Sequence, residues 1–196
     1  MRHVNVIIPV YKYEELTNTA KGVVKDDYLG NNRTITEFDI RITTELEEIG
    51  FYDIDIAFSL TYCQGDGLSF TGKISCEDLF KIDYLKDRTD LSDEVIYNLK
   101  DTLDYIEIIR IDNRYTHYNT CKVVLNGDLT WMNDKDYCHF YDDITQYYQT
   151  LCRRFERDGY RWFYEVDEEE VIKHCNDNNL EFTSDGRIFD RTLETT

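Results

Sequence analysis

The chain has 196 residues, with 40 Asp and Glu against 22 Lys and Arg, and its formal net charge is −18. This acidic excess argues against a conventional nucleic-acid binder, which needs a basic face, and against a peripheral membrane protein with a basic amphipathic stripe. Hydrophobic residues make up 41% and aromatic residues 14%, which is enough apolar surface for a core, so we expect one globular domain over residues 1–196.

A strand and two helices are expected in the first 50 residues. Apolar and polar side chains alternate over residues 4–10, which indicates a strand. Thr17 is a candidate N-cap for a helix that ends near Gly30. The Thr34–Glu37 stretch fits a capping box, and apolar residues follow at helical spacing as far as Gly50, which indicates a second helix.

The clearest β signal is the strict alternation over residues 53–62, in which every second side chain is apolar. The turn Cys63–Gly67 leads into a second strand over residues 68–74, so the two strands should form a hairpin. Ser75 and Ser92 are the expected N-caps of two short helices.

A second pair of strands is expected over residues 106–111 and 115–125, and residues 141–163 should form the longest helix. Asp167 opens a further helix, and residues 181–189 have the pattern of a small hairpin. The strands come in antiparallel pairs and the helices intervene without a βαβ rhythm. We therefore predict an α+β fold, an antiparallel sheet built from hairpins with several packed helices.

Three stretches of the chain together form a known pattern. They are Tyr13-Glu14-Glu15-Leu16 with Ala20-Lys21, then Cys63-Gln64-Gly65-Asp66-Gly67-Leu68-Ser69-Phe70, and Glu181-Phe182-Thr183-Ser184-Asp185-Gly186-Arg187. Their order and spacing resemble a family of small acidic proteins that is widespread in tailed bacteriophages. In that family a Gln-Gly-Asp-Gly-x-x-Phe hairpin precedes a histidine-bearing strand, which His117 would match, and a long helix.

The chain departs from this family at Cys63, where Ser is usual, and at Leu68, where Ala is usual. Residues 126–140 are inserted or divergent. The resemblance implies a phage or prophage origin and an accessory, host-facing role, and some members of the family carry an antitoxin label. It supplies no catalytic residues.

Metal and nucleophile chemistry are not indicated. Six cysteines include no Cys-x-x-Cys pair, so we expect reduced and mostly buried thiols. Cys138-His139 and His174-Cys175 are adjacent pairs, which point in different directions and make poor zinc ligands. Acidic neighbours such as Asp142-Asp143 do not show the convergence from several elements that a two-metal site needs. We predict no metal, no cofactor and no enzyme; a small hydrolase that depends on Asp66 or His117 is the alternative.

Two sets of surface residues are candidate contacts. The predicted partner-binding residues are Gln64, Asp66, Asp53, Asp55, Glu168, Glu169, Glu170 and Tyr164. The Gln64–Gly67 turn can instead be purely structural. Arg153, Arg157 and Arg161 share a helical face and are candidates for self-association into a homodimer, with internal pairing to nearby acids as the alternative.

The sixteen tyrosines and the acidic charge together predict a protein that occupies a basic groove. Our hypothesis is a phage-encoded inhibitor of a host nucleic-acid-handling defence system, similar to anti-CRISPR proteins, that blocks its target sterically and electrostatically. The expected partner is a basic host protein such as a nuclease effector, with no direct nucleic-acid or membrane contact. The expected location is the host cytoplasm, since the N-terminus lacks a signal-peptide pattern. The alternative is an antitoxin or regulatory module that neutralises a basic toxin.

Overall fold

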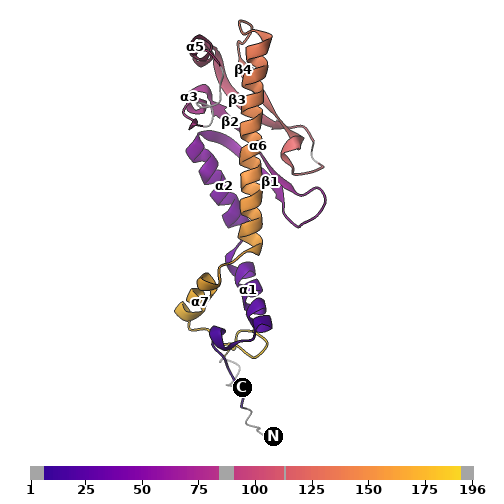
Figure 1. Cartoon of the computed structure of the whole chain (residues 1–196), viewed down its shortest axis with the longest axis vertical. Helices are drawn as coiled ribbons and strands as arrows, with labels where there is room; N and C mark the ends of the chain where they lie inside the picture. Colours follow the sequence, from indigo (N-terminus) through magenta and orange to yellow (C-terminus); the bar gives the residue numbers. More distant parts are fainter. Residues whose placement is uncertain (1–6, 84–90, 113, 191–196) are drawn as a thin grey trace. The chain divides into compact units, whose positions relative to one another are not determined.

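In the computed structural model, the described residues are 7–83, 91–112 and 114–190 (Figure 1). Their contacts divide the chain into unit 1 (Met1–Ile35 with Arg161–Thr196) and unit 2 (Thr36–Tyr160), and each unit is described by itself. The single domain over residues 1–196 stays a prediction.

Unit 2 is built on an antiparallel sheet whose described strands lie in the order β1-β2-β3-β4. The strands are β1 (Phe51–Ser59), β2 (Gly67–Ser75), β3 (Leu103–Arg110) and β4 (Cys121–Gly127). Each strand pairs with the next along the chain, and α3 (Cys76–Leu79) and α5 (Asp93–Thr102) lie between β2 and β3. This arrangement confirms the predicted α+β fold with an antiparallel sheet.

The two long helices α2 (Ile35–Ile49) and α6 (Asp134–Tyr164) pack on the same face of this sheet (Figure 1). The ring centroids of Phe38 in α2 and Phe58 in β1 are 5.2 Å apart, and those of Tyr148 in α6 and Phe70 in β2 are 5.1 Å apart. The Tyr148 hydroxyl also donates a hydrogen bond to the Phe70 carbonyl oxygen, 3.2 Å away. The core of unit 2 therefore lies between these helices and the sheet.

Gly159 sets how closely α6 approaches its neighbours. A Cβ atom at this position would collide with Leu60 Cδ1 and lie 2.8 Å from Phe38 Cζ. Glycine is a poor helix former, so its presence inside a helix needs a reason of this kind.

Unit 1 has its own core, formed by a 3₁₀ turn (Tyr13–Glu15), α1 (Asn18–Asn32), α7 (Glu168–Asp177) and the turn that follows α7. The buried members of this core are Tyr13, Leu16, Ala20, Val24, Val171, Cys175 and Phe182. Phe182 forms isolated β-bridges with Tyr11 and with Ile188, so residues 181–189 double back as the sequence predicts.

Four predicted helix starts are confirmed by side-chain caps. The capping bonds run from the N–H of Ala20 to Thr17, of Asp78 to Ser75, of Val95 to Ser92 and of Glu169 to Asp167. Helix α6 begins seven residues before its predicted start, because the Asn133 side chain accepts a hydrogen bond from the N–H of Asp136 (3.0 Å) and begins the helix there.

The predicted strand over residues 115–125 is wrong in its first half, because regular pairing with β3 begins only at Cys121. Residues Tyr118–Thr120 form a 3₁₀ turn instead. His117 caps this turn, since its Nδ1 accepts a hydrogen bond from the N–H of Asn119 across 3.2 Å. The alternation of aromatic and polar residues that suggested a strand arises from rings that pack on the neighbouring β1–β2 turn.

Other boundaries also differ. The predicted first strand is absent where the chain is described, since residues 7–10 have no regular structure, and residues 4–6 lie outside the described residues. The helix after Ser75 ends at Leu79, and Leu85, predicted to belong to it, lies outside the described residues. Of the helices in the described part of the chain, none combines the length and the apolar character that crossing a membrane requires.

Candidate functional site

The β1–β2 turn is organised around the carboxylate of Asp66. Its Oδ2 accepts hydrogen bonds from the N–H groups of Thr61 (2.6 Å) and Cys63 (2.8 Å), and its Oδ1 accepts one from the Ser59 hydroxyl (2.7 Å). Partial desolvation raises the pKa of this carboxyl, but the hydrogen bonds outweigh it and hold the pKa well below its usual range. Asp66 thus shapes the turn, and its predicted contact with a partner stays a prediction.

Aromatic rings surround this turn. The φ angle of Gly65 is +99°, and a Cβ atom there would lie 2.7 Å from Cδ1 of Tyr115, so only glycine lets that ring pack on the turn. Tyr62 also has a positive φ, of 58°, and remains 71% exposed, while Tyr115 is 54% exposed. Gln64 is exposed beside them. The turn therefore exposes two aromatic rings beside Gln64, and the predicted partner contact of Gln64 stays a prediction.

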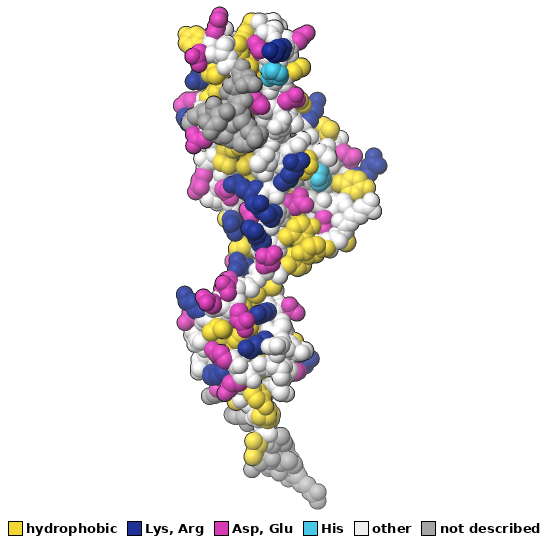
Figure 2. All heavy atoms as spheres, in the orientation of Figure 1, with side chains coloured by type: hydrophobic (Ala, Val, Ile, Leu, Met, Phe, Trp, Pro, Cys, Tyr) yellow, Lys and Arg dark blue, Asp and Glu magenta, His cyan; other side chains and the backbone are white. Residues whose placement is uncertain are grey.

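The arginine stripe consists of Arg153, Arg157 and Arg161, which share one face of α6, and its first two members have internal partners. Arg153 donates a hydrogen bond to the Tyr118 hydroxyl (2.8 Å), and its guanidinium lies 5.0 Å from the Tyr118 ring centroid. Arg157 is the more available member, since its side chain is 63% exposed and its ion pair with Asp158 is 3.9 Å long. Arg161 belongs to unit 1 and is exposed. Figure 2 shows a group of Lys and Arg side chains over the C-terminal half of α6. Self-association through this stripe stays a prediction.

The two predicted acids of β1 differ in their surroundings. Asp53 forms an ion pair with Lys73 (3.2 Å), which also lies 3.9 Å from Glu107. Asp55 is exposed, and no basic side chain in the described ranges pairs with it. Only Asp55 is therefore available for an outside cation without breaking an internal contact.

Two of the three predicted glutamates of α7, Glu168 and Glu170, form ion pairs inside unit 1. Glu168 lies 3.7 Å from Lys21 Nζ and 3.5 Å from Lys25 Nζ, and these lysines, Lys25 foremost, lower the pKa of its carboxyl. Glu170 forms a 2.6 Å ion pair with Arg33, whose guanidinium stacks over the Trp162 ring at 4.3 Å.

Glu169 and Tyr164, the other two predicted contacts in unit 1, are exposed. Because unit 1 is described separately from unit 2, these residues are not brought together with Gln64, Asp66 or Asp55 in one described site. The predicted partner-binding residues therefore fall into two groups, one on each unit.

A set of residues that sequence reasoning missed lies around Thr102, at the C-terminal end of α5. The Thr102 carbonyl oxygen accepts a hydrogen bond from the N–H of Asp128 (3.0 Å), and its hydroxyl accepts one from Trp131 Nε1 (2.9 Å). Asp101 directly precedes Thr102, and Asp104 lies where the pairing of β3 with β4 is irregular. Segments 29 residues apart in the sequence are thereby joined.

We name Tyr97, Asp101, Asp104, Asp128 and Trp131 the acidic–aromatic surface. Tyr97 lies one helical turn before Asp101 on α5 and is 74% exposed, and Trp131 is 37% exposed. The three aspartates are exposed, and they form no ion pair with another described residue. Figure 2 shows acidic side chains at this end of unit 2, around α5 and the start of α6. The only signal in the sequence is the local mixture of acids and aromatics.

The cysteines are mainly core residues, as predicted: Cys76, Cys121, Cys152 and Cys175 are buried, while Cys63 and Cys138 are exposed. Burial raises the pKa of the Cys76 thiol to about 11 and that of Cys152 to about 12, so both are held protonated at neutral pH. The described residues contain no group of three or more His, Cys, Asp or Glu side chains placed to hold a metal ion.

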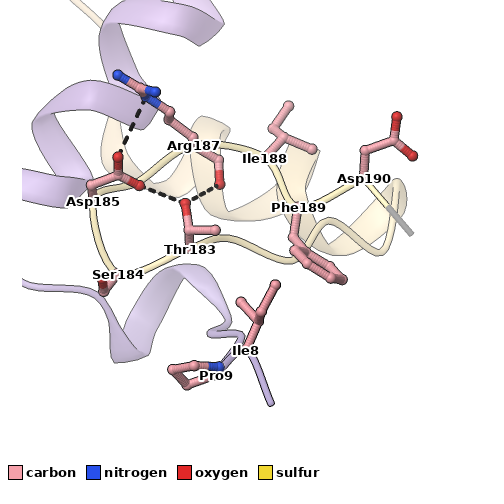
Figure 3. Close-up of a pocket in the computed structure, with 9 residues that line it drawn as sticks. All are labelled: Ile8, Pro9, Thr183, Ser184, Asp185, Arg187, Ile188, Phe189 and Asp190. Atoms are coloured by element: carbon pink, nitrogen blue, oxygen red, sulfur yellow. Dashed lines mark hydrogen bonds and ion pairs between the residues drawn. The ribbon is translucent and has the colours of Figure 1, made fainter. Parts of the chain in front are cut away.

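A hollow of about 640 Å³ in unit 1 is lined by residues near both ends of the described chain (Figure 3). Phe189 lies close to Ile8 and Pro9 and makes its floor apolar. On its rim, the Thr183 hydroxyl donates a hydrogen bond to Asp185, which also pairs with Arg187 at 3.4 Å. Thr183, Asp185 and Arg187 thus bond to one another at the rim, beside an apolar floor.

Comparisons of the chain with protein-family models, with curated proteins and with solved structures gave no match. The resemblance to the tailed-phage family therefore stays a prediction. Its most specific stretch, residues 64–70, forms most of the Asp66 turn and the start of β2.

Proposed function

We propose that the protein is a non-enzymatic inhibitor that binds a basic protein through the acidic–aromatic surface. The observation that carries this proposal is the presence of three exposed carboxylates on the segments beside Thr102, whose carbonyl and hydroxyl oxygens accept hydrogen bonds from the Asp128 N–H and from Trp131 Nε1. Carboxylates that have no internal cation are available to Lys and Arg of a partner without the loss of an existing pair.

Charge and aromatic contacts have separate roles in this binding. Unit 2 contains 26 Asp and Glu against 13 Lys and Arg, so its field attracts a basic partner over distance and raises the association rate. The Trp131 and Tyr97 rings supply contact area at low conformational cost, and such residues commonly dominate binding energy at protein interfaces.

The partner that fits the sequence is a nuclease effector of a host nucleic-acid-handling defence system, whose basic groove would be filled in place of nucleic acid. The protein would then be phage-encoded and act in the host cytoplasm, without contacting nucleic acid itself. An antitoxin that neutralises a basic toxin uses the same surface, and a neighbouring toxin gene with rescue from its toxicity would favour this second function.

The test begins with co-purification of the tagged protein from host cells, with and without nuclease treatment, to identify a basic protein that it retains. The dissociation constant is then measured for wild type and for the triple variant Asp101→Asn, Asp104→Asn, Asp128→Asn. In wild type, the Thr130 hydroxyl donates a hydrogen bond to Asp128 Oδ1 across 2.7 Å. Asparagine at position 128 keeps a side-chain oxygen that can accept this bond, so the local turn should survive.

The triple variant should bind about 10- to 100-fold more weakly, since each exposed charge pair contributes up to about 1 kcal/mol. The matched control is Glu47→Gln, Glu48→Gln, Asp142→Asn, which removes the same charge from exposed positions elsewhere in unit 2. Equal weakening in both variants would show that only net charge matters. Unchanged binding by the first variant, or retention of no basic protein, would refute the proposal.

A further inference from the structure

We propose that the open edge of β1 binds an extended basic segment of a partner protein, which adds to the sheet as a fifth strand. This inference deepens the proposed function, on which it relies for the positive charge of the partner. It concerns different residues from the acidic–aromatic surface, so the two can be tested separately.

The position of β1 in the sheet provides the first support. In the order β1-β2-β3-β4 of the described strands, β1 is an edge strand, and among these strands it pairs only with β2. Regular pairing covers Asp55 to Ser59, opposite Thr71 to Gly67. Over residues 52–57, no hydrogen bond within the described ranges other than this ladder uses a backbone group. Alternate residues of an edge strand direct both N–H and C=O away from the sheet, so main-chain donors and acceptors are available there.

The side chains of β1 determine what kind of strand fits. Asp55 is exposed without a basic partner, and Asp53 is 66% exposed beside its single lysine. Ile54 and Ile56 are only partly buried, which leaves apolar surface next to the open edge. A strand that alternates Lys or Arg with apolar residues would place its cations near Asp55 and its apolar residues near Ile56.

A second copy of this chain does not fit the same edge. In the antiparallel registers that place Asp55 of one β1 strand opposite Asp53 or Asp55 of another, the carboxylates of both copies would lie close together, which is destabilising. The register shift between Tyr52 and Asp55, with Asp53 at a φ of 53°, also limits the regular edge to about five residues. The opposite edge strand, β4 (Cys121–Gly127), contains Lys122 and no acidic residue, so it lacks this complementarity.

The experiment uses three end-blocked peptides with the full-length protein: Lys-Val-Lys-Val-Lys, Glu-Val-Glu-Val-Glu, and the lysine peptide with N-methyl groups on alternate residues. Binding is followed by NMR titration and by amide hydrogen exchange. The lysine peptide should shift the amide signals of Asp55–Ser59 and slow their exchange. The glutamate peptide should do neither, and the N-methylated peptide should lose at least about 10-fold in affinity because it cannot complete the ladder.

Two charge-reversal variants complete the test. Asp55→Lys should reverse the preference, so that the glutamate peptide binds more tightly than the lysine peptide. The control Asp104→Lys makes the same change on the acidic–aromatic surface and should leave peptide binding at β1 unchanged, whatever it does to binding of a purified partner. If Asp104→Lys lost partner binding and kept peptide binding, the result would thus bear on the acidic–aromatic surface of the proposed function and not on the edge of β1.

Three results would overturn this inference. Equal binding of the N-methylated peptide would mean that charge contact alone is involved. Lysine-peptide shifts confined to residues near Thr102 would place the contact on the other surface. Protection of Asp55–Ser59 that grows with protein concentration, without peptide, would identify a second copy as the occupant.

Discussion

The Tyr160 hydroxyl donates a hydrogen bond to Asp66 Oδ2 across 3.1 Å, and so ties α6 to the β1–β2 turn. The Tyr160 ring also lies against Tyr62, with centroids 4.6 Å apart and planes 34° apart. Tyr62 has a positive φ that a bulky residue rarely adopts, so a contact from a long helix holds a turn that local preferences alone would not favour. The exposed part of this turn is thus preorganised by residues nearly one hundred positions away.

Replacement of Tyr160 by Phe tests the contribution of its hydrogen bond to Asp66. The variant keeps the ring contact with Tyr62 and loses the hydrogen bond to Asp66, so the free energy of unfolding should fall by about 1 kcal/mol. Urea denaturation measures this change, and faster amide exchange at Thr61 and Cys63 should locate it. The control Tyr97→Phe removes a hydroxyl that forms no hydrogen bond with another described residue, and should change the stability by less than about 0.5 kcal/mol. Equal effects in both variants would contradict a structural role for Tyr160.

The pKa of Asp66 gives the stability of the protein a predictable acid dependence. Because the folded-state pKa is lowered, the stabilisation from the ionised carboxylate is present above the unfolded-state pKa, about 3.9, and is lost as the pH falls from there toward the folded-state value. The difference in urea midpoint between wild type and Asp66→Asn should therefore be constant from pH 7 to about pH 5 and shrink below about pH 4. A difference that stays constant down to pH 3 would mean that the ionised form of Asp66 is not preferred by the fold.

Gly159 allows a comparison of two glycine replacements. Gly159→Ala improves helix propensity, but its Cβ would collide with Leu60 and crowd Phe38, so we expect a net loss of about 1–3 kcal/mol in unit 2. Gly22→Ala, inside α1, has no atom within 4 Å of the new Cβ and should stabilise unit 1 by about 0.5–1 kcal/mol. Amide exchange of each unit during denaturation distinguishes the two. A stabilising Gly159→Ala would show that α6 can move away from Leu60 without cost.

Features that depend on a few neighbouring residues were predictable from the sequence. Thr17, Ser92 and Asp167 mark helix starts because a capping side chain bonds an N–H only two or three residues away. The alternation of apolar and polar residues before Cys63 and the glycines after it similarly predicted the β1–β2 hairpin. The α+β class followed from these elements alone.

Features that depend on distant residues were not predictable in the same way. The alternation around Tyr115 and His117 looks like a strand, but these rings pack on Gly65 and Gly67 of another hairpin. The ion pairs of Glu168 with Lys21 and Lys25 depend on how α1 and α7 pack. The acidic–aromatic surface exists only because Trp131 reaches Thr102, and neither residue has a local pattern that indicates the other. The contact residues predicted from charge composition therefore stay predictions, and the sequence alone did not indicate the acidic–aromatic surface as a second candidate.

The bond from Trp131 Nε1 to Thr102 Oγ1 (2.9 Å) is the contact that holds the indole on this surface, and Thr102→Val removes its acceptor while keeping the shape of the side chain. Trp131 should become more mobile and more exposed than its present 37%. In a Trp162→Phe background, which leaves Trp131 as the single tryptophan, we expect a red-shifted emission and at least about a twofold increase in acrylamide quenching, with little change in the urea midpoint because the bond is partly exposed. The control Thr150→Val removes the hydroxyl of another helical threonine, which donates a hydrogen bond to the Gln146 carbonyl oxygen at 2.8 Å, and should leave the emission unchanged. If Thr102→Val also leaves the emission unchanged, the indole is positioned by packing alone and not by the bond to Thr102.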